Sequence, residues 1–277
     1  MGLRINTNIA SINAQRNLNA SRQGMETTLE RLSSGNRINR SGDDAAGLAV
    51  SERLNAQIKG LRQARRNSED GISLIQVAEG ALNEVGNILI RMREMGVQAS
   101  SDTIGNVERE FLQTEFLQLA QEISRITEGT TFNTTQLLNG QGEMMDIQVG
   151  TGNNILVDRI SFDSSKTNTT LEALGIDHAG LARKEDAQRS LDIFDNAINQ
   201  VSAMRADLGA IQNRLQSTIT NINISLENLS AAHSRIKDVD YAEATAELAR
   251  NNILLQAGTA VLNQANQSTA MALSLLG

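Results

Sequence analysis

Apolar side chains recur every seven residues through the second half of the chain. Members of two rows alternate at spacings of three and four residues, which is the pattern of a coiled-coil seam. The first row is Ala187, Phe194, Val201, Leu208, Leu215, Ile222, Leu229 and Ile236. The second row is Leu191, Ile198, Ile219 and Leu226, interrupted by Arg205, Gln212 and His233. The pattern predicts a helix over about 185–234, roughly 75 Å long at about 1.5 Å per residue.

A matching row lies in the first half of the chain. Its members are Leu54, Leu61, Ile75, Leu82 and Leu89, with Ser68 as the polar member. The preceding segment SGDDAAGLAV offers Asp43 or Asp44 as an N-cap, with acidic charge at the positive end of the helix dipole. The polar segment ASSDTIGN then ends the pattern, which predicts a helix over about 44–99. A shorter helix over about 105–128 is predicted by Leu112, Phe116, Leu119, Ile123 and Ile126.

The pattern changes between residues 130 and 180. The stretch MMDIQVGTGNNILVDRISF alternates around the turn residues GTGNN, which predicts one small β-hairpin over about 144–162. The next stretch, SSKTNTTLEALGIDHAG, has neither period, so a short exposed variable loop is expected over about 164–180. The fold class predicted from all these segments is mainly α, with long antiparallel helices in a coiled-coil-like bundle and one hairpin.

Both ends of the chain carry thinner helical stripes. A narrow apolar stripe cannot offset the entropy of ordering an isolated helix, so both ends are expected to be mobile until they bind something. Pairing the two ends would give each stripe one partner. A second apolar face near the C-terminus would remain uncovered, and we expect another subunit to cover it. The stripes comprise Ile5, Ile9, Ile12, Leu18, Met25, Leu29 and Leu32 at one end, and Leu248, Ile253, Leu255 and Leu262 at the other.

Composition agrees with long helices and argues against several functions. The chain has no proline, no tryptophan, one tyrosine and five phenylalanines, which suits aliphatic helix-on-helix seams rather than an aromatic globular core. No apolar stretch is long enough to span a bilayer, so no membrane insertion is expected. The N-terminus lacks the apolar core of a cleavable signal peptide. The net charge of −7 argues against a nucleic-acid partner.

Candidate catalytic chemistry is sparse. The chain has no cysteine and two histidines, and it lacks HExxH, GxSxG and Gly-rich phosphate-binding motifs. His178 falls in the expected loop, and His233 falls in the predicted seam. The pair Asp43–Asp44 is explained by helix capping. We therefore expect no enzymatic activity, no catalytic residues, no metal site and no cofactor.

Two long segments resemble a known family. LSSGNRINRSGDDAAGLAVSERLNAQIKGLRQARRNSEDGISLIQVAEGALNEV, residues 32–85, closely resembles the N-terminal region of bacterial flagellins. SRIKDVDYAEATAELARNNILLQAGTAVLNQANQSTAMALSLLG, residues 234–277, resembles their C-terminal region. The resemblance implies a minimal flagellin that polymerises into the flagellar filament, the propeller for swimming. Two alternatives remain open: a hook-filament junction protein, and a non-filamentous coiled-coil secretion or signalling module.

The resemblance also implies a domain organisation, a location and partners. It implies an inner-tube domain formed by 1–43 plus 235–277 and an outer helical domain over 44–234. It implies an extracellular filament subunit that leaves the cell through the flagellar type III export apparatus without signal cleavage. The implied partners are further copies of the chain, a flagellin export chaperone, that export apparatus, the filament cap and hook-filament junction proteins, and the vertebrate innate-immune flagellin receptor.

Three groups of site residues follow from the terminal stripes and the resemblance. The chaperone candidates are Leu248, Leu255 and Leu262. The candidates for receptor recognition and subunit packing are Arg91, Glu94, Met95, Gln98 and Glu115. The candidates for the assembly interface are Ile5, Ile9, Ile12, Leu18, Met25, Leu29, Leu32, Leu248, Ile253, Leu255, Leu262, Leu273, Leu275 and Leu276.

Overall fold

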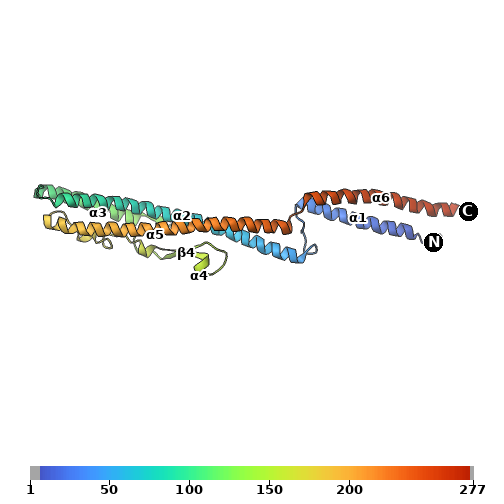
Figure 1. Ribbon diagram of the computed structural model, residues 1–277, viewed down its shortest axis with the longest axis horizontal. Helices are drawn as coiled ribbons and strands as arrows, with labels where there is room; N and C mark the ends of the chain where they lie inside the picture. Colours follow the sequence, from blue (N-terminus) through green and yellow to red (C-terminus); the bar gives the residue numbers. More distant parts are fainter. Residues whose placement is uncertain (1–6, 275–277) are drawn as a thin grey trace. The chain divides into compact units, whose positions relative to one another are not determined.

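The computed structural model describes residues 7–274, with side chains described as far as residue 267. Five long helices dominate this part of the chain (Figure 1). They are α1 (Ile9–Ser34), α2 (Ala45–Ala99), α3 (Asn106–Gly129), α5 (Lys184–Lys237) and α6 (Tyr241–Ser274). The mainly α fold is thus confirmed, and α2, α3 and α5 begin and end within three residues of the predicted positions.

The chain divides into two compact units. One, called here the terminal unit, comprises Met1–Ala56 and Glu227–Gly277. The other, called here the core unit, comprises Gln57–Leu226.

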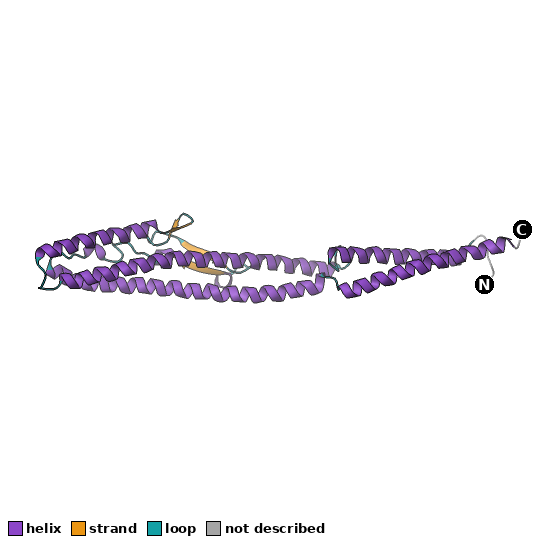
Figure 2. Cartoon of the chain, turned by 90° about the horizontal axis from the view of Figure 1, so that it is seen from above, coloured by secondary structure: helices purple, strands orange, loops and turns teal. Residues whose placement is uncertain are grey.

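The core unit is a three-helix bundle formed by α2, α3 and α5 (Figure 2). The rows predicted on α2 and α5 are buried or partly buried, with Leu82 and Leu89 from α2 and Phe194 from α5 fully inaccessible. Phe116 of α3 contacts Phe194 at a ring-centroid distance of 5.9 Å. A Cβ at Gly96 would lie 3.1 Å from the Phe194 ring, so glycine allows α5 to pack closely against α2 here. The seven-residue repeat therefore forms the core of this unit.

Arg109 of α3 closes the turn between α2 and α3. Its guanidinium is buried and donates hydrogen bonds to the carbonyl oxygens of Ala99 and Ser101, each at 2.8 Å. It also donates to Asn106 Oδ1 at 2.9 Å. Carbonyls at a helix C-terminus have no partner within the helix. Arg109 therefore supplies hydrogen-bond donors from the neighbouring helix to carbonyl oxygens at the end of α2.

Two small antiparallel hairpins follow α3. The predicted hairpin is present as β3 (Met144–Gln148) and β4 (Arg159–Asp163), joined by a loop that carries the short helix α4 (Ile155–Asp158). A second hairpin, β1 (Thr131–Phe132) with β2 (Thr135–Gln136), turns through two residues of positive φ, Asn133 and Thr134. Such a turn matches the twist of a hairpin. The prediction of one hairpin is therefore extended to two.

The expectation of an exposed loop over 164–180 is wrong. This segment holds the 3₁₀ helices η1 (Ser164–Lys166) and η2 (Ile176–His178), and Thr167, Thr169 and Ile176 are buried. Thr167 Oγ1 donates to the Leu137 carbonyl oxygen at 2.7 Å, and Thr169 N donates to that of Leu138 at 2.9 Å. Short hydroxyl side chains can be buried where backbone carbonyls accept their hydrogen bonds. The segment therefore belongs to the core.

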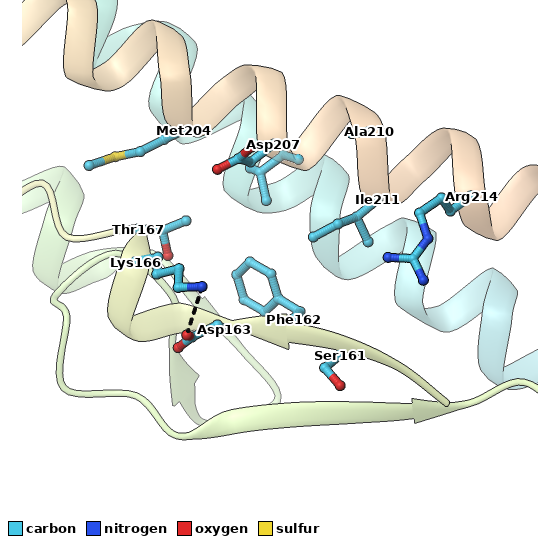
Figure 3. Close-up of a pocket in the computed structure, with 11 residues that line it drawn as sticks. Ser161, Phe162, Asp163, Lys166, Thr167, Met204, Asp207, Ala210, Ile211 and Arg214 are labelled. Carbon is cyan, nitrogen blue, oxygen red and sulfur yellow. Dashed lines mark ion pairs between the residues drawn. The ribbon is translucent and has the colours of Figure 1, made fainter. Parts of the chain in front are cut away.

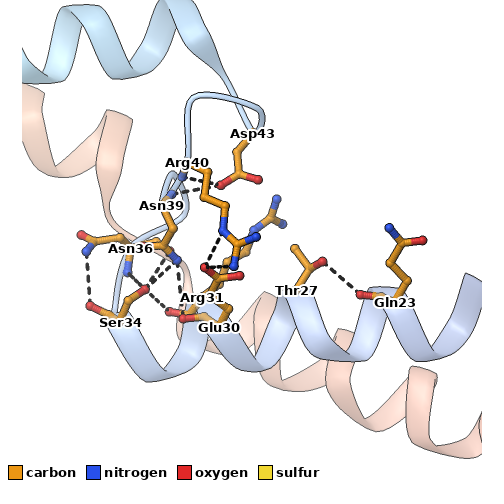
Figure 4. Close-up of polar contacts among 9 residues, drawn as sticks. All are labelled: Gln23, Thr27, Glu30, Arg31, Ser34, Asn36, Asn39, Arg40 and Asp43. Atoms are coloured by element: carbon orange, nitrogen blue, oxygen red, sulfur yellow. Dashed lines mark hydrogen bonds and ion pairs between the residues drawn. The ribbon is translucent and has the colours of Figure 1, made fainter.

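Polar contacts hold the connection between α1 and α2 in the terminal unit (Figure 4). Asn39 Nδ2 donates to Ser34 Oγ at 2.8 Å, and Arg40 pairs with Glu30 at 3.0 Å. The carboxylate of Asp43 accepts from the backbone N–H groups of Asn39 and Arg40, both at 3.0 Å. These two hydrogen bonds lower the pKa of Asp43 below its ordinary value.

Asp44 is the N-cap of α2. Its Oδ1 accepts a hydrogen bond from Gly47 N at 2.8 Å, so Asp44 is the cap of the two predicted candidates. The two acidic residues therefore have separate local tasks, because Asp43 fixes the turn and Asp44 begins the helix.

Replacing Arg109 tests its role in the core unit. We expect Arg109→Ala to lower the free energy of unfolding by about 2–3 kcal/mol, because buried carbonyls lose charged donors. Urea unfolding followed by circular dichroism measures this change. Arg62→Ala, an exposed change on α2, is the matched control and should stay within about 0.5 kcal/mol of the wild type. Equal midpoints for the two variants would contradict the assigned role.

Replacing Asp43 tests the turn between α1 and α2. A carboxylate with a lowered folded-state pKa stabilises the turn above the unfolded pKa and loses this effect as the pH falls through the folded value. Asp43→Ala should therefore reduce amide-exchange protection at Asn39 and Arg40 at neutral pH. As the pH falls through the folded-state pKa of Asp43, which lies below the ordinary value, the wild type should approach the variant. Hydrogen exchange corrected for intrinsic rates measures both, with Asp70→Ala as control. Wild-type protection in the variant at pH 7 would contradict this assignment.

Candidate assembly interface

The terminal unit pairs α1 with α6 in antiparallel orientation (Figure 1). At one end Asn8 Nδ2 donates to the Ala265 carbonyl oxygen at 2.9 Å. At the other end the Tyr241 hydroxyl donates to the Leu32 carbonyl oxygen at 3.0 Å. A Cβ at Gly258 would lie 3.4 Å from Leu18, so the two helices approach closely between these ends. The two ends of the chain thus supply partner faces to each other, as predicted.

The seam between α1 and α6 is narrow and mixed in character. Each helix has a row of partly or fully buried positions that alternate three and four residues apart. On α1 the row is Ser11, Ala14, Leu18, Ser21, Met25, Thr28 and Leu32, and Gly24, Thr27, Glu30 and Arg31 beside it are also partly buried. On α6 the row is Ala244, Leu248, Asn251, Leu255, Gly258, Leu262 and Ala265. Small and polar residues make up more than half of these positions, so the seam buries little apolar area and stabilises the pair only weakly.

Other apolar side chains of the pair face outward. Their exposed fractions lie between 46% and 65% in the single chain. The outward set is Ile9, Ile12 and Leu29 on α1, and Ile253, Leu254 and Val261 on α6. Exposed apolar surface of this kind commonly marks a site of association. Within the described residues, no helix is long and apolar enough to cross a membrane.

The predicted interface residues therefore fall into two groups. Leu18, Met25, Leu32, Leu248, Leu255 and Leu262 lie in the seam. Ile9, Ile12, Leu29 and Ile253 lie on the outward faces. Ile5, Leu275 and Leu276 lie outside the described residues, and Leu273 belongs to α6 but its side chain is not described. Leu254 and Val261 were not identified from the sequence, although each lies one residue before a seam leucine and so outside the seam.

The second candidate site lies on α2 and α3 of the core unit. Arg91 pairs with Glu115 across the two helices at 2.9 Å and with Glu94 along α2 at 3.2 Å. The pairing along α2 was predicted. Hydrogen bonds that the Arg91 guanidinium donates to Glu115 and Glu94 raise the pKa of Arg91, so it remains charged. Gln98 is also exposed, and these four residues are available to a partner.

Met95 cannot belong to that surface. Its side chain is 0% exposed and forms part of the core together with Met92 and Ala99. The prediction that Met95 contacts a receptor or a neighbouring subunit is therefore wrong. Residues 92, 95 and 99 share the buried face of α2, while Arg91 and Glu94 lie on the exposed face.

The described residues offer no centre for catalysis by a bound metal. Among them, no group of three or more histidine, cysteine, aspartate or glutamate side chains is placed to hold a metal ion. Charged side chains of the core unit instead form exposed ion pairs, such as Arg93 with Asp195 at 2.5 Å and Lys184 with Asp102 at 2.7 Å. The candidate sites thus consist of exposed apolar side chains and exposed ion pairs.

Long helices and exposed apolar side chains on the paired chain ends are typical of structural proteins that assemble. Comparison with known families agrees with this class. The bacterial flagellin N-terminal helical region matches residues 5–143, and the bacterial flagellin C-terminal helical region matches residues 191–276. The chain belongs to the bacterial flagellin family, whose members are the structural subunits of the flagellar filament.

Individual relatives match along nearly the full chain. A flagellin of Halalkalibacterium halodurans is 49% identical over 275 residues, covering 98% of this chain and 99% of the relative. A flagellin of Bacillus subtilis is 41% identical over 305 residues, covering 99% of this chain and 100% of the relative. Among solved structures, Bacillus cereus flagellin is similar with a TM-score of 0.51 and 27% identity, covering 61% of this chain and 94% of that one.

The fold is shared more widely than the sequence. A putative flagellar hook-associated protein from Vibrio parahaemolyticus has a TM-score of 0.60 at 14% identity. That structure is covered completely, and it covers 71% of this chain. At this identity the likeness concerns the fold alone.

Proposed function

We propose that this flagellin polymerises by burying the outward faces of α1 and α6 against neighbouring copies. The observation that supports the proposal is the set of six apolar side chains that remain exposed on a pair whose seam is already formed. The same proposal assigns 1–43 plus 235–277 to an inner tube and 44–234 to a surrounding helical layer. The protein acts mechanically outside the cell and catalyses no reaction.

Burial on assembly supplies the free energy that the isolated ends lack. Fully burying an exposed aliphatic side chain contributes about 1.5–3 kcal/mol. The six side chains are 46–65% exposed, so completing their burial contributes roughly 5–10 kcal/mol before ordering costs. The seam alone is too thin to keep α1 and α6 ordered against conformational entropy. We infer that the ends are mobile in the monomer and become ordered as they enter the filament. This coupling limits assembly before export.

The export chaperone and the seam compete for the same side chains. Leu248, Leu255 and Leu262 are proposed to bind the chaperone through one face of α6, in the helix-in-groove mode. Those leucines contribute to the seam with α1 in the folded chain. A chaperone on this face therefore displaces α1 and holds the end unpaired. Release follows at the type III export apparatus, through which the chain passes without signal cleavage.

Outside the cell, the proposed partners are the filament cap, which places new subunits, and the hook-filament junction proteins, on which the filament begins. A second candidate function is that of a junction protein, supported by the shared fold of the hook-associated protein. A junction protein would not form long filaments by itself. A non-filamentous coiled-coil module would keep its oligomeric state when residues 251–277 are removed.

Seeded polymerisation tests the proposal. Purified full-length protein should extend filament seeds, as observed by negative-stain electron microscopy. Removing residues 251–277 should abolish growth while the core unit keeps its cooperative thermal unfolding. The double variant Ile253→Ser with Val261→Ser should behave like the truncation, because it removes only outward apolar surface.

The matched control keeps those positions apolar. Ile253→Val with Val261→Ile should extend seeds at a rate within about twofold of the wild type. Globular particles in the wild-type and truncated samples alike would contradict polymerisation. Filament growth by the serine variant would contradict the assignment to the outward faces.

We further propose that the innate-immune flagellin receptor recognises an exposed surface on α2 and α3. Arg91, Glu94 and Gln98 contribute to this surface from α2, and Glu115 contributes from α3. Arg91→Ala should lower receptor signalling by monomeric protein by roughly tenfold or more, because a partly exposed charged anchor is lost. Met95→Leu should leave signalling unchanged, since Met95 is buried. A receptor-reporter cell assay measures both. Equal signalling by wild type and Arg91→Ala would contradict the proposal.

A further inference from the structure

The segment between the two hairpins contains an asparagine followed by glycine. Asn139 is the one asparagine of the chain with glycine after it, at Gly140. Glycine leaves its own backbone nitrogen free of steric hindrance, because it has no Cβ. That nitrogen can attack the amide carbon of the preceding asparagine, which is the first step of spontaneous deamidation. The dipeptide is therefore a candidate site of covalent modification.

The fold requires glycine at position 140. Gly140 has a φ of +70°, in the left-handed region that favours glycine. A Cβ there would also lie 2.5 Å from Asn168 Nδ2, which is too close for a side chain. Both constraints are steric and have no relation to the chemistry of Asn139. A bulkier and less reactive residue at position 140 would therefore strain the turn.

Hydrogen bonds hold the Asn139 side chain against its own main chain. The backbone N–H of Gln141 donates to Asn139 Oδ1 at 3.0 Å, which forms an Asx turn around Gly140. The side-chain amide nitrogen of Asn139 donates to Gln136 Oε1. An Asx turn curls the side chain toward the following peptide unit, so it brings the amide carbon of Asn139 toward Gly140.

The Gln141 N–H also favours the reaction electrostatically. Attack on the amide carbon moves negative charge onto Asn139 Oδ1 in the tetrahedral intermediate. A backbone N–H that already donates to this oxygen stabilises such charge, as in an oxyanion hole. The same contact therefore orients the amide and stabilises the intermediate.

Water has access to the side chain of Asn139. An open cavity of about 470 Å³ is lined by Asn139, Gln141 and Glu143 together with other residues of the two hairpins, most of them polar. A groove of about 330 Å³ between β4 and α5 is also open, but none of the residues that line it is an asparagine (Figure 3). The cavity at Asn139 therefore combines the reactive amide with the water that the later steps consume.

We infer that Asn139 deamidates in the folded protein, with water as the co-reactant. The Gly140 nitrogen loses its proton to hydroxide and forms a bond to the Asn139 amide carbon. The bond between that carbon and Nδ2 then breaks, and Nδ2 takes up a proton from water and leaves as ammonia. Water opens the resulting succinimide at either carbonyl, which gives aspartate or isoaspartate at position 139.

Isoaspartate would alter the packing of the core unit. It lengthens the main chain by one methylene between Leu138 and Gly140. The Leu138 carbonyl oxygen, next to this point, accepts from Thr169 N at 2.9 Å. Thr167 Oγ1 donates to the Leu137 carbonyl oxygen at 2.7 Å, and Thr167 also lines the β4–α5 groove (Figure 3). A longer connection at position 139 should therefore loosen the attachment of the segment after β4.

Incubation of the soluble, folded chain at mildly alkaline pH tests the reaction. Peptide mass spectrometry should find a mixture of aspartate and isoaspartate at position 139, formed faster than at any other asparagine. The rate should rise in proportion to hydroxide concentration, because the Gly140 nitrogen reacts without its proton. Asn139→Gln is the matched control and should stay unconverted over the same interval, since the longer side chain would have to close a larger ring.

The unfolded chain separates the effect of the fold from that of the dipeptide. In urea, Asn139 can react through Gly140 without the Asx turn. We expect the folded chain to convert at least as fast, because Gln141 orients and stabilises the reacting amide. Slower conversion in the folded chain, or aspartate without isoaspartate, would overturn the inference.

Hydrogen exchange measures the consequence. The fraction that contains isoaspartate should lose amide protection at Thr169 relative to unaged protein. Asn139→Asp adds the same charge without lengthening the main chain and should keep wild-type protection. Equal loss in this variant, or full protection in the isoaspartate fraction, would contradict the role of chain length. None of these measurements uses filaments, so their outcome is independent of the proposed polymerisation.

Discussion

Burial of the two apolar rows of α2 and α5 against each other is the interaction on which the core unit depends. Each row offers one narrow face, so neither helix is stable alone over this length. Together they form a stiff support whose register places the other elements. Phe194 continues the seam to Phe116 of α3. A seam of aliphatic residues with few aromatics suits a rod, because it grows in length without growing in thickness.

The terminal unit uses the same heptad geometry with a different composition. Its seam has Ser11, Ala14 and Thr28 on α1 and Asn251 and Gly258 on α6, where the core unit has leucine, isoleucine or phenylalanine. Larger apolar side chains instead lie on the outward faces. A chain with the opposite distribution would form a stable helical hairpin with a polar surface. It would have no exposed apolar surface through which to associate. The weak seam and the apolar outer surface are therefore two consequences of one sequence pattern.

The sequence predicted the features that depend on local signals. Periodicity and capping by Asp44 placed the long helices, since both act within a few turns. Burial of Thr167 and Thr169 could not be predicted, because their hydrogen-bond partners at Leu137 and Leu138 lie some thirty residues away. The prediction of an exposed contact at Met95 failed for a different reason. The resemblance suggested an exposed contact, but Met95 lies three residues after Met92, in the phase of the buried row. Periodicity was the better guide to which face of the helix a residue occupies.

Assembly from several small apolar surfaces has a physical advantage over assembly from one large surface. A single large patch would bind any partner during synthesis and export, when no filament is present. Weak surfaces contribute little until the first contact holds two copies together, after which each further contact forms at high effective concentration. The outward faces of α1 and α6 depend on an ordered pair of helices. In the proposed filament, the terminal helices would therefore fold against a copy already in place, and the outward faces would form only where a partner covers them.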